Sequence, residues 1–173
     1  MRLPLTPFER LTLVNQYRLL AAASKDERES YLRLADELES GYAYLYSEFP
    51  HLQEELPRDR SDFVVQVLAL FDKLKISYQR LTDKSGIKAT DVVFPGFDGN
   101  NEAELLGFTH ALARRGQFLD VLGKEPKNSH MPSVDVYQRM LEGWMAIGRP
   151  AAPLSADQIK SILAARVHPE NRP

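Results

Sequence analysis

The sequence predicts an all-α protein, a single-domain helical bundle of about six helices with one long irregular loop. Apolar residues recur at helical spacing in six segments, and most of these segments have recognisable capping residues. The segments are residues 6–23, 24–41, 58–81, 101–116, 133–147 and 155–167. Only residues 42–49 alternate as a strand does, and a lone strand would lack a pairing partner. We expect one domain over residues 1–173.

The first helix, predicted over residues 6–23, is apolar on two opposite faces. Thr6 is placed to cap it, Pro7 suits the first helical position, and Glu9 completes a capping box. One face carries Leu13, Val14, Tyr17, Leu20 and Ala21. The opposite face carries Phe8, Leu11, Asn15 and Leu19. A helix that is apolar on both sides must be covered on both sides, so it lies in a bundle centre, at a subunit interface, or both.

The second face, Phe8, Leu11, Asn15 and Leu19, is therefore a candidate interface. A buried Asn15 without hydrogen bonds would cost a few kcal/mol, so we expect its amide to be paired. One interpretation is a polar network inside the core. The other is a residue that fixes the register where two copies of the chain associate. The sequence leaves both open.

Two helices follow. Ser24 and Glu27 form a second capping box, and Gly41 suits the residue just past the end of that helix. The aromatic residues of the 42–49 segment come next. The longest helix is predicted over residues 58–81.

Residues 94–102 form the candidate ligand or partner loop. Pro95 and Gly96 fit the two central positions of a type II turn, which would bring Phe94 and Phe97 together. Asp98 follows, and Asn101 is expected to cap the next helix, with Glu102 in its first turn. The loop is either a structural anchor held by an Asx bond or a small ligand or peptide site beside a helix N-terminus. The candidate residues are Phe94, Phe97, Asp98, Asn101 and Glu102.

The C-terminal part is expected to contain two more helices after an irregular stretch at residues 118–131. The first covers residues 133–147 and ends at Gly148. The second opens at Ser155, with Gln158 completing a capping box.

Several segments, in this order, resemble the YfbU family of small bacterial cytosolic proteins. They are residues 9–17 (ERLTLVNQY), 41–42 (GY), 94–98 (FPGFD) with Glu102, 106–108 (LGF), 137–141 (YQRML) with Trp144, and 154–156 (LSA). The resemblance covers residues 6–165, nearly the whole chain. It implies an α-helical fold and a cytosolic location, and it supplies no activity, cofactor or catalytic residue.

Composition narrows the classes of function. There is no cysteine, so thiolate catalysis, thiolate metal sites and disulfides are excluded. The phosphate-binding glycine patterns and the HExxH zinc motif are absent, and we assign no catalytic, cofactor-binding or metal-binding residues. Residues 25–62 hold eleven acidic and five basic residues, so no nucleic-acid partner is expected. No apolar run is long enough for a membrane span, and we expect a cytoplasmic protein.

These observations predict a non-enzymatic, self-associating regulatory or protein-interaction module. We expect a homo-oligomer, with a further protein as a possible partner. The alternative is a hydrolase or nucleotide-directed enzyme of unfamiliar pattern that uses the loop carboxylates Asp98 and Glu102.

Overall fold

The computed structural model describes residues 5–48, 55–168 and 170. Within these residues it contains seven α-helices, two short 3-10 helices and no strand, so the predicted all-α fold is confirmed. All six predicted helical segments are present. The seventh helix is α5 (Leu119–Leu122), a single turn inside the stretch predicted to be irregular. The chain divides into two compact units, Met1–Glu54 and Glu55–Pro173. That the two units act as one domain stays a prediction.

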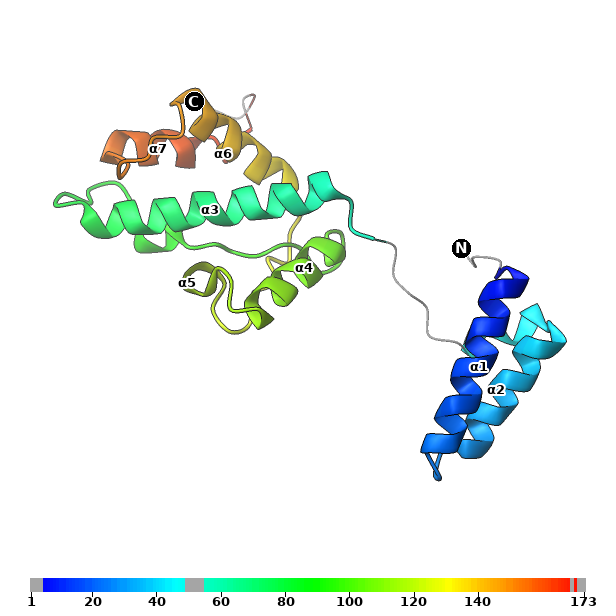
Figure 1. Cartoon of the computed structure of the whole chain (residues 1–173). Coiled ribbons are helices and arrows are strands. Elements are labelled where there is room, and N and C mark those ends of the chain that lie inside the picture. The colour runs from blue at the N-terminus through cyan, green and yellow to red at the C-terminus, as the bar shows by residue number, and fades with distance from the viewer. Residues whose placement is uncertain (1–4, 49–54, 169, 171–173) are drawn as a thin grey trace. The chain divides into compact units, whose positions relative to one another are not determined.

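The N-terminal unit is a helical hairpin in which α1 (Pro7–Ala23) and α2 (Arg28–Ser40) lie side by side (Figure 1). The 3-10 helix η1 (Ala43–Glu48) follows; Phe49, the last residue of the aromatic segment, lies outside the described residues. The hairpin buries few residues. Its core is Val14, Ala35 and Leu38, with Leu5, Leu13, Tyr17 and Tyr46 packed against it and partly buried.

The capping residues explain where these helices begin and end. Thr6 and Glu9 form the predicted capping box of α1. Gly41 has a φ of 76°, the left-handed conformation that favours glycine just past a helix end. Half of the predicted capping box at Ser24 is present, since the Ser24 hydroxyl accepts the backbone N–H of Glu27 at 3.4 Å. The predicted helix start is wrong: the backbone N–H of Ser24 closes α1 by donating to Leu20, and α2 begins at Arg28.

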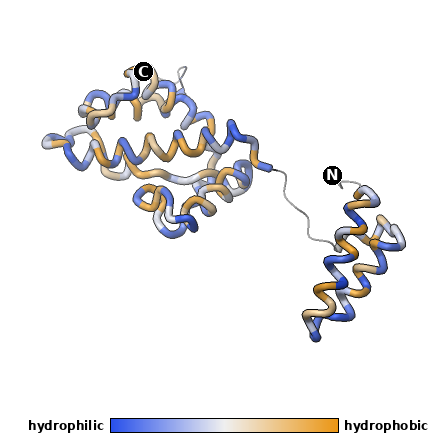
Figure 2. Tube along the Cα trace, viewed as in Figure 1, coloured by the Kyte–Doolittle hydropathy of each residue, from blue (hydrophilic) through white to orange (hydrophobic). Residues whose placement is uncertain are grey.

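In the C-terminal unit, α3 (Arg58–Arg80) is the central helix. Figure 1 shows α4 (Ala103–Arg114) and α5 along one side of it, and α6 (Val134–Ala146) and α7 (Ala156–Ala164) along the other. Apolar positions recur along the whole of α3 (Figure 2). Its buried residues are Val64, Val67, Leu68, Leu70, Phe71, Leu74 and Ser77. Because helices pack on both sides of α3, this unit has a much larger core than the hairpin.

Two links position the candidate loop in this unit. The 3-10 helix η2 (Ala89–Val92) packs against α3 and leads into residues 93–97. Phe97 pairs with Asn128 through an isolated parallel bridge, in which Ser129 donates its backbone N–H to the carbonyl of Phe97. The loop before α4 and the stretch before α6 therefore lie beside each other, although about thirty residues separate them.

Candidate functional site

The segment at residues 94–97 is anchored by its two aromatic side chains. Phe94 and Phe97 are buried and meet edge to face, with ring centroids 5.6 Å apart, as the sequence predicted. Both rings also contact Tyr137 of α6 at 5.7 and 5.5 Å between centroids. Edge-to-face packing of this kind stabilises a core beyond the burial of apolar area. The aromatic pair therefore holds the loop to α6.

Glycine is required at position 96 of this segment. Its φ of 108° lies in the region that side chains disfavour. The predicted type II turn over residues 94–97 is wrong, because residues 94–96 form no turn or bend, Phe97 pairs with Asn128, and the turn lies at residues 99–101. A Cβ atom placed at Gly96 would lie 1.8 Å from the carbonyl oxygen of Lys127. The carbonyl of Gly96 accepts a hydrogen bond of 2.6 Å from the hydroxyl of Tyr137. Burial raises the pKa of Tyr137, so this hydroxyl stays protonated and continues to donate.

Glu102 is buried and connects the loop to the start of α6. Its carboxylate accepts the backbone N–H groups of Ser133 at 2.6 Å and Val134 at 2.8 Å, and the Ser133 hydroxyl at 2.7 Å. The backbone N–H of Asp98 donates to the same carboxylate at 2.9 Å. The first N–H groups of a helix have no partner within the helix. Glu102 therefore caps α6 from another part of the chain.

The charge of Glu102 suits this capping role. Burial raises the pKa of the Glu102 carboxyl, but the hydrogen bonds from Ser133, Asp98 and Val134 outweigh that effect. The net result is a pKa below the ordinary value, so the group stays ionised at neutral pH. A carboxylate at a helix N-terminus is also favoured by the helix dipole.

Asp98 is buried and closes an Asx turn. Its carboxylate accepts the backbone N–H of Asn100 at 3.2 Å and the side-chain amide of Asn101. The hydrogen bond from the Asn101 side chain is the main reason that the pKa of Asp98 lies below its ordinary value. The predicted capping of α4 by Asn101 is wrong: the helix begins at Ala103, and the exposed Asn101 instead donates to Asp98.

Together these contacts give the loop a structural role. Phe94 and Phe97 fill the core, Asp98 shapes the turn, and Glu102 joins it to α6. Across the part of the chain that the structure describes, no three His, Asp or Glu side chains gather in a way that could hold a metal ion. A ligand or partner role for this loop stays a prediction.

The predicted second face of α1 is exposed. Phe8, Leu11 and Leu19 are 78%, 58% and 71% accessible, and Asn15 between them is also exposed. The other face of the helix packs against α2 through Val14 and Ala21. Among residues 5–48 of this unit none covers that face, so these residues form no core network around Asn15. That the face is an interface stays a prediction.

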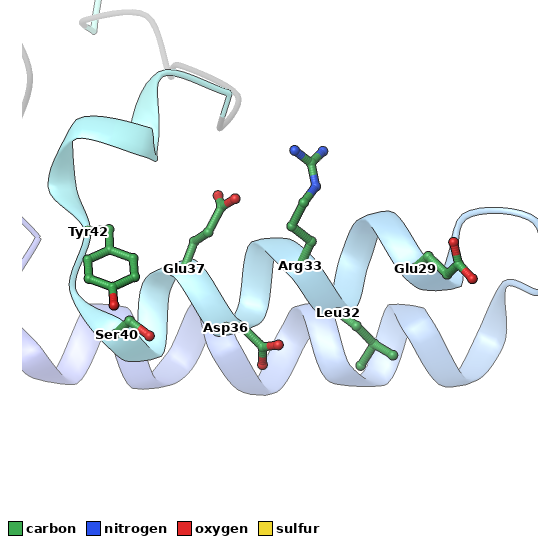
Figure 3. A pocket seen from close by; sticks show the side chains of 7 residues that line it. All are labelled: Glu29, Leu32, Arg33, Asp36, Glu37, Ser40 and Tyr42. Atoms are coloured by element: carbon green, nitrogen blue, oxygen red, sulfur yellow. The ribbon is translucent and has the colours of Figure 1, made fainter.

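A groove that the sequence does not predict lies on α2. Figure 3 shows its lining, which comes from α2 and from Tyr42 just after it, and its volume is about 400 Å³. The lining residues are Glu29, Leu32, Arg33, Asp36, Glu37, Ser40 and Tyr42. Three of the four charged residues are acidic, which agrees with the excess of acidic residues noted at 25–62. That excess was the available signal, but the sequence does not indicate which acidic residues share a groove.

The YfbU domain profile matches residues 3–165. A UPF0304 protein of Methanocaldococcus jannaschii, MJECS11, is 31% identical over 169 residues, which cover 93% of this chain and 99% of that protein. That this chain is bacterial stays a prediction. None of the helices in the described residues has both the length and the apolar character needed to cross a bilayer.

Proposed function

This chain belongs to the YfbU family, and from that premise we propose that it is a non-enzymatic, self-associating protein-interaction module with a regulatory role in the cytoplasm. The observation that carries the proposal is the exposed apolar face of α1, formed by Phe8, Leu11 and Leu19. Exposed apolar residues that gather on one face mark interaction surfaces more often than scattered ones do.

The small core of the hairpin supports the same proposal. Two helices that bury only a handful of apolar side chains gain little stability, and units of this size normally need disulfides, a metal or association. The chain has no cysteine. Burying Phe8, Leu11 and Leu19 would each contribute about 1.5–3 kcal/mol. Association through this face would therefore stabilise the hairpin itself.

The enzyme alternative has weaker support from the geometry. It depends on Asp98 and Glu102, and both carboxylates already accept hydrogen bonds from the surrounding loop or from α6. A catalytic carboxylate must reach a substrate, whereas these two hold the backbone in place. Exposed aromatic residues after α2, Tyr42 and Tyr44, instead favour a surface for a protein partner.

The proposal predicts that Leu11→Asp dissociates the oligomer. A buried aspartate without a partner loses its hydration. Each copy also loses the contribution that the buried leucine makes to the free energy of association. We expect the dissociation constant to rise roughly 100-fold or more. Light scattering and sedimentation at several concentrations measure it, and circular dichroism should show that the helices persist.

The matched control is Leu20→Asp. Leu20 lies on the same helix and is 45% exposed, but it points away from the Phe8–Leu11–Leu19 face. This variant should stay associated. A wild-type chain that is monomeric at micromolar concentration, or equal weakening by both substitutions, would contradict the proposed role of the face.

A further inference from the structure

The residues on the exposed face of α1 are spaced symmetrically about Asn15. Leu11 and Leu19 lie four residues before and after Asn15, and Phe8 and Ala22 lie seven residues before and after it. All five residues are exposed, and they fall on one side of the helix. An isologous two-fold contact requires a patch that is complementary to itself. A helix with this symmetry about one residue meets that requirement when a second copy runs in the opposite direction.

We propose that two copies of this chain pair through antiparallel α1 helices, with Asn15 of one copy against Asn15 of the other. In this register Leu11 lies level with Leu19 of the second copy, and Phe8 lies level with Ala22. The inference rests on the proposed self-association and adds the contact surface, the direction and the register.

Asn15 argues for a second copy as the occupant. A polar side chain at the centre of an apolar contact is costly unless it is hydrogen-bonded. The side-chain amide of asparagine both donates and accepts, so two asparagines that face each other satisfy one another. A single asparagine at such a position also fixes register in paired helices. Only a second copy places an identical amide opposite the first.

Side-chain volume argues for the antiparallel direction. A parallel pair would set Phe8 against Phe8 at one end and Ala22 against Ala22 at the other, which forces the helices apart at one end and leaves a gap at the other. The antiparallel pair sets the large residue against the small one at both ends, and so packs evenly. The helix dipoles also favour opposite directions.

Cysteine cross-linking tests the register in the full chain, because the chain contains no cysteine of its own. Facing residues of two packed helices bring their Cα atoms into the range of about 4.4–6.8 Å that a disulfide requires. In the proposed register, Leu11 lies about 12 Å along the helix axis from Leu11 of the second copy, which is too far. The test uses three single variants, Asn15→Cys, Leu11→Cys and Leu19→Cys. Each protein is oxidised and then separated on a non-reducing gel.

We expect Asn15→Cys to cross-link alone and Leu11→Cys to cross-link only when mixed and equilibrated with Leu19→Cys. The mixture should give at least tenfold more disulfide-linked dimer than Leu11→Cys alone. If a leucine variant loses its helical circular dichroism signal, Ala22→Cys mixed with Phe8→Cys provides the second test pair of the same register.

The other outcomes separate this inference from the proposed function. Efficient cross-linking of Leu11→Cys alone would show parallel helices, which overturns the register but leaves self-association standing. An oligomer by light scattering that forms none of these cross-links would place the contact elsewhere and overturn the inference. A monomer by light scattering would overturn both proposals, and would mean that something other than a second copy covers the face.

Discussion

At the scale of single residues, Glu102 shows how a charge is kept inside the C-terminal unit. Four hydrogen-bond donors surround its carboxylate, three of them backbone N–H groups and one the Ser133 hydroxyl. Removing one partner from such a set leaves the others buried and unsatisfied, which costs more than the bond itself contributes. The sequence indicated Glu102 as an acidic residue in a first helical turn and as a candidate loop carboxylate, but not as the cap of α6, because its partner Ser133 lies 31 residues away.

We predict that Glu102→Gln lowers the free energy of unfolding at pH 7 by about 1–3 kcal/mol. The amide has only one oxygen to serve four donors, and its NH₂ group faces donors. Denaturant unfolding followed by Trp144 fluorescence measures the change in the C-terminal unit. Glu104→Gln is the control, since Glu104 is exposed and pairs with Arg60 at the surface, and its replacement should cost less than about 1 kcal/mol.

The difference in free energy of unfolding between wild type and Glu102→Gln should depend on pH. The pKa of Glu102 is lower in the folded protein than its ordinary value of 4.5. The ionised carboxylate therefore makes its full contribution to the stability of the fold above that value. The contribution is lost as the pH falls through the lower folded pKa. The difference between wild type and Glu102→Gln should therefore shrink in acid. A difference that stays constant from neutral pH into that range would show that the charge is unimportant.

At the scale of elements, the sequence predicted local contacts and missed distant ones. The capping boxes at Thr6 and Ser155 were found because each pairs residues three apart. The starts of α2 and α4 were wrong because the backbone N–H of Ser24 and the side chain of Asn101 have other partners. Ser24 closes the preceding helix, and Asn101 donates to Asp98. The contact between Phe94 and Phe97 was predicted, although through a type II turn that is not formed, and their contacts with Tyr137 were not predicted.

The close packing around Gly96 predicts that Gly96→Ala lowers the free energy of unfolding of the C-terminal unit by more than about 2 kcal/mol. The added methyl group would meet the backbone of Lys127 at a φ that side chains disfavour. Gly107→Ala is the matched control. Gly107 lies inside α4 with open space around the position of a Cβ, so alanine should raise stability by about 0.5–1 kcal/mol. Equal effects at the two glycines in thermal unfolding would refute this account of Gly96.

At the scale of the whole molecule, the two units differ in how they obtain stability. The C-terminal unit has an extended apolar core built around α3, whereas the N-terminal hairpin buries few side chains and exposes Phe8, Leu11 and Leu19. The sequence predicted that the first helix needs cover on both faces, and this remains the main physical requirement of the hairpin. It did not predict the division into two units, because helical periodicity identifies faces but not which helices share a core.

This difference predicts that only the hairpin depends on protein concentration. If association supplies its missing core, unfolding is linked to dissociation, and a 100-fold rise in concentration stabilises the associated form. Between about 2 and 200 µM we expect the melting temperature of the hairpin transition, seen by circular dichroism, to rise by more than about 5 °C. Trp144, the one tryptophan of the chain, lies in α6 and reports the C-terminal unit, so its fluorescence melting curve should stay constant. Leu11→Asp should remove the concentration dependence from the circular dichroism curve. Curves that coincide at all concentrations by both probes would show that self-association does not stabilise the hairpin.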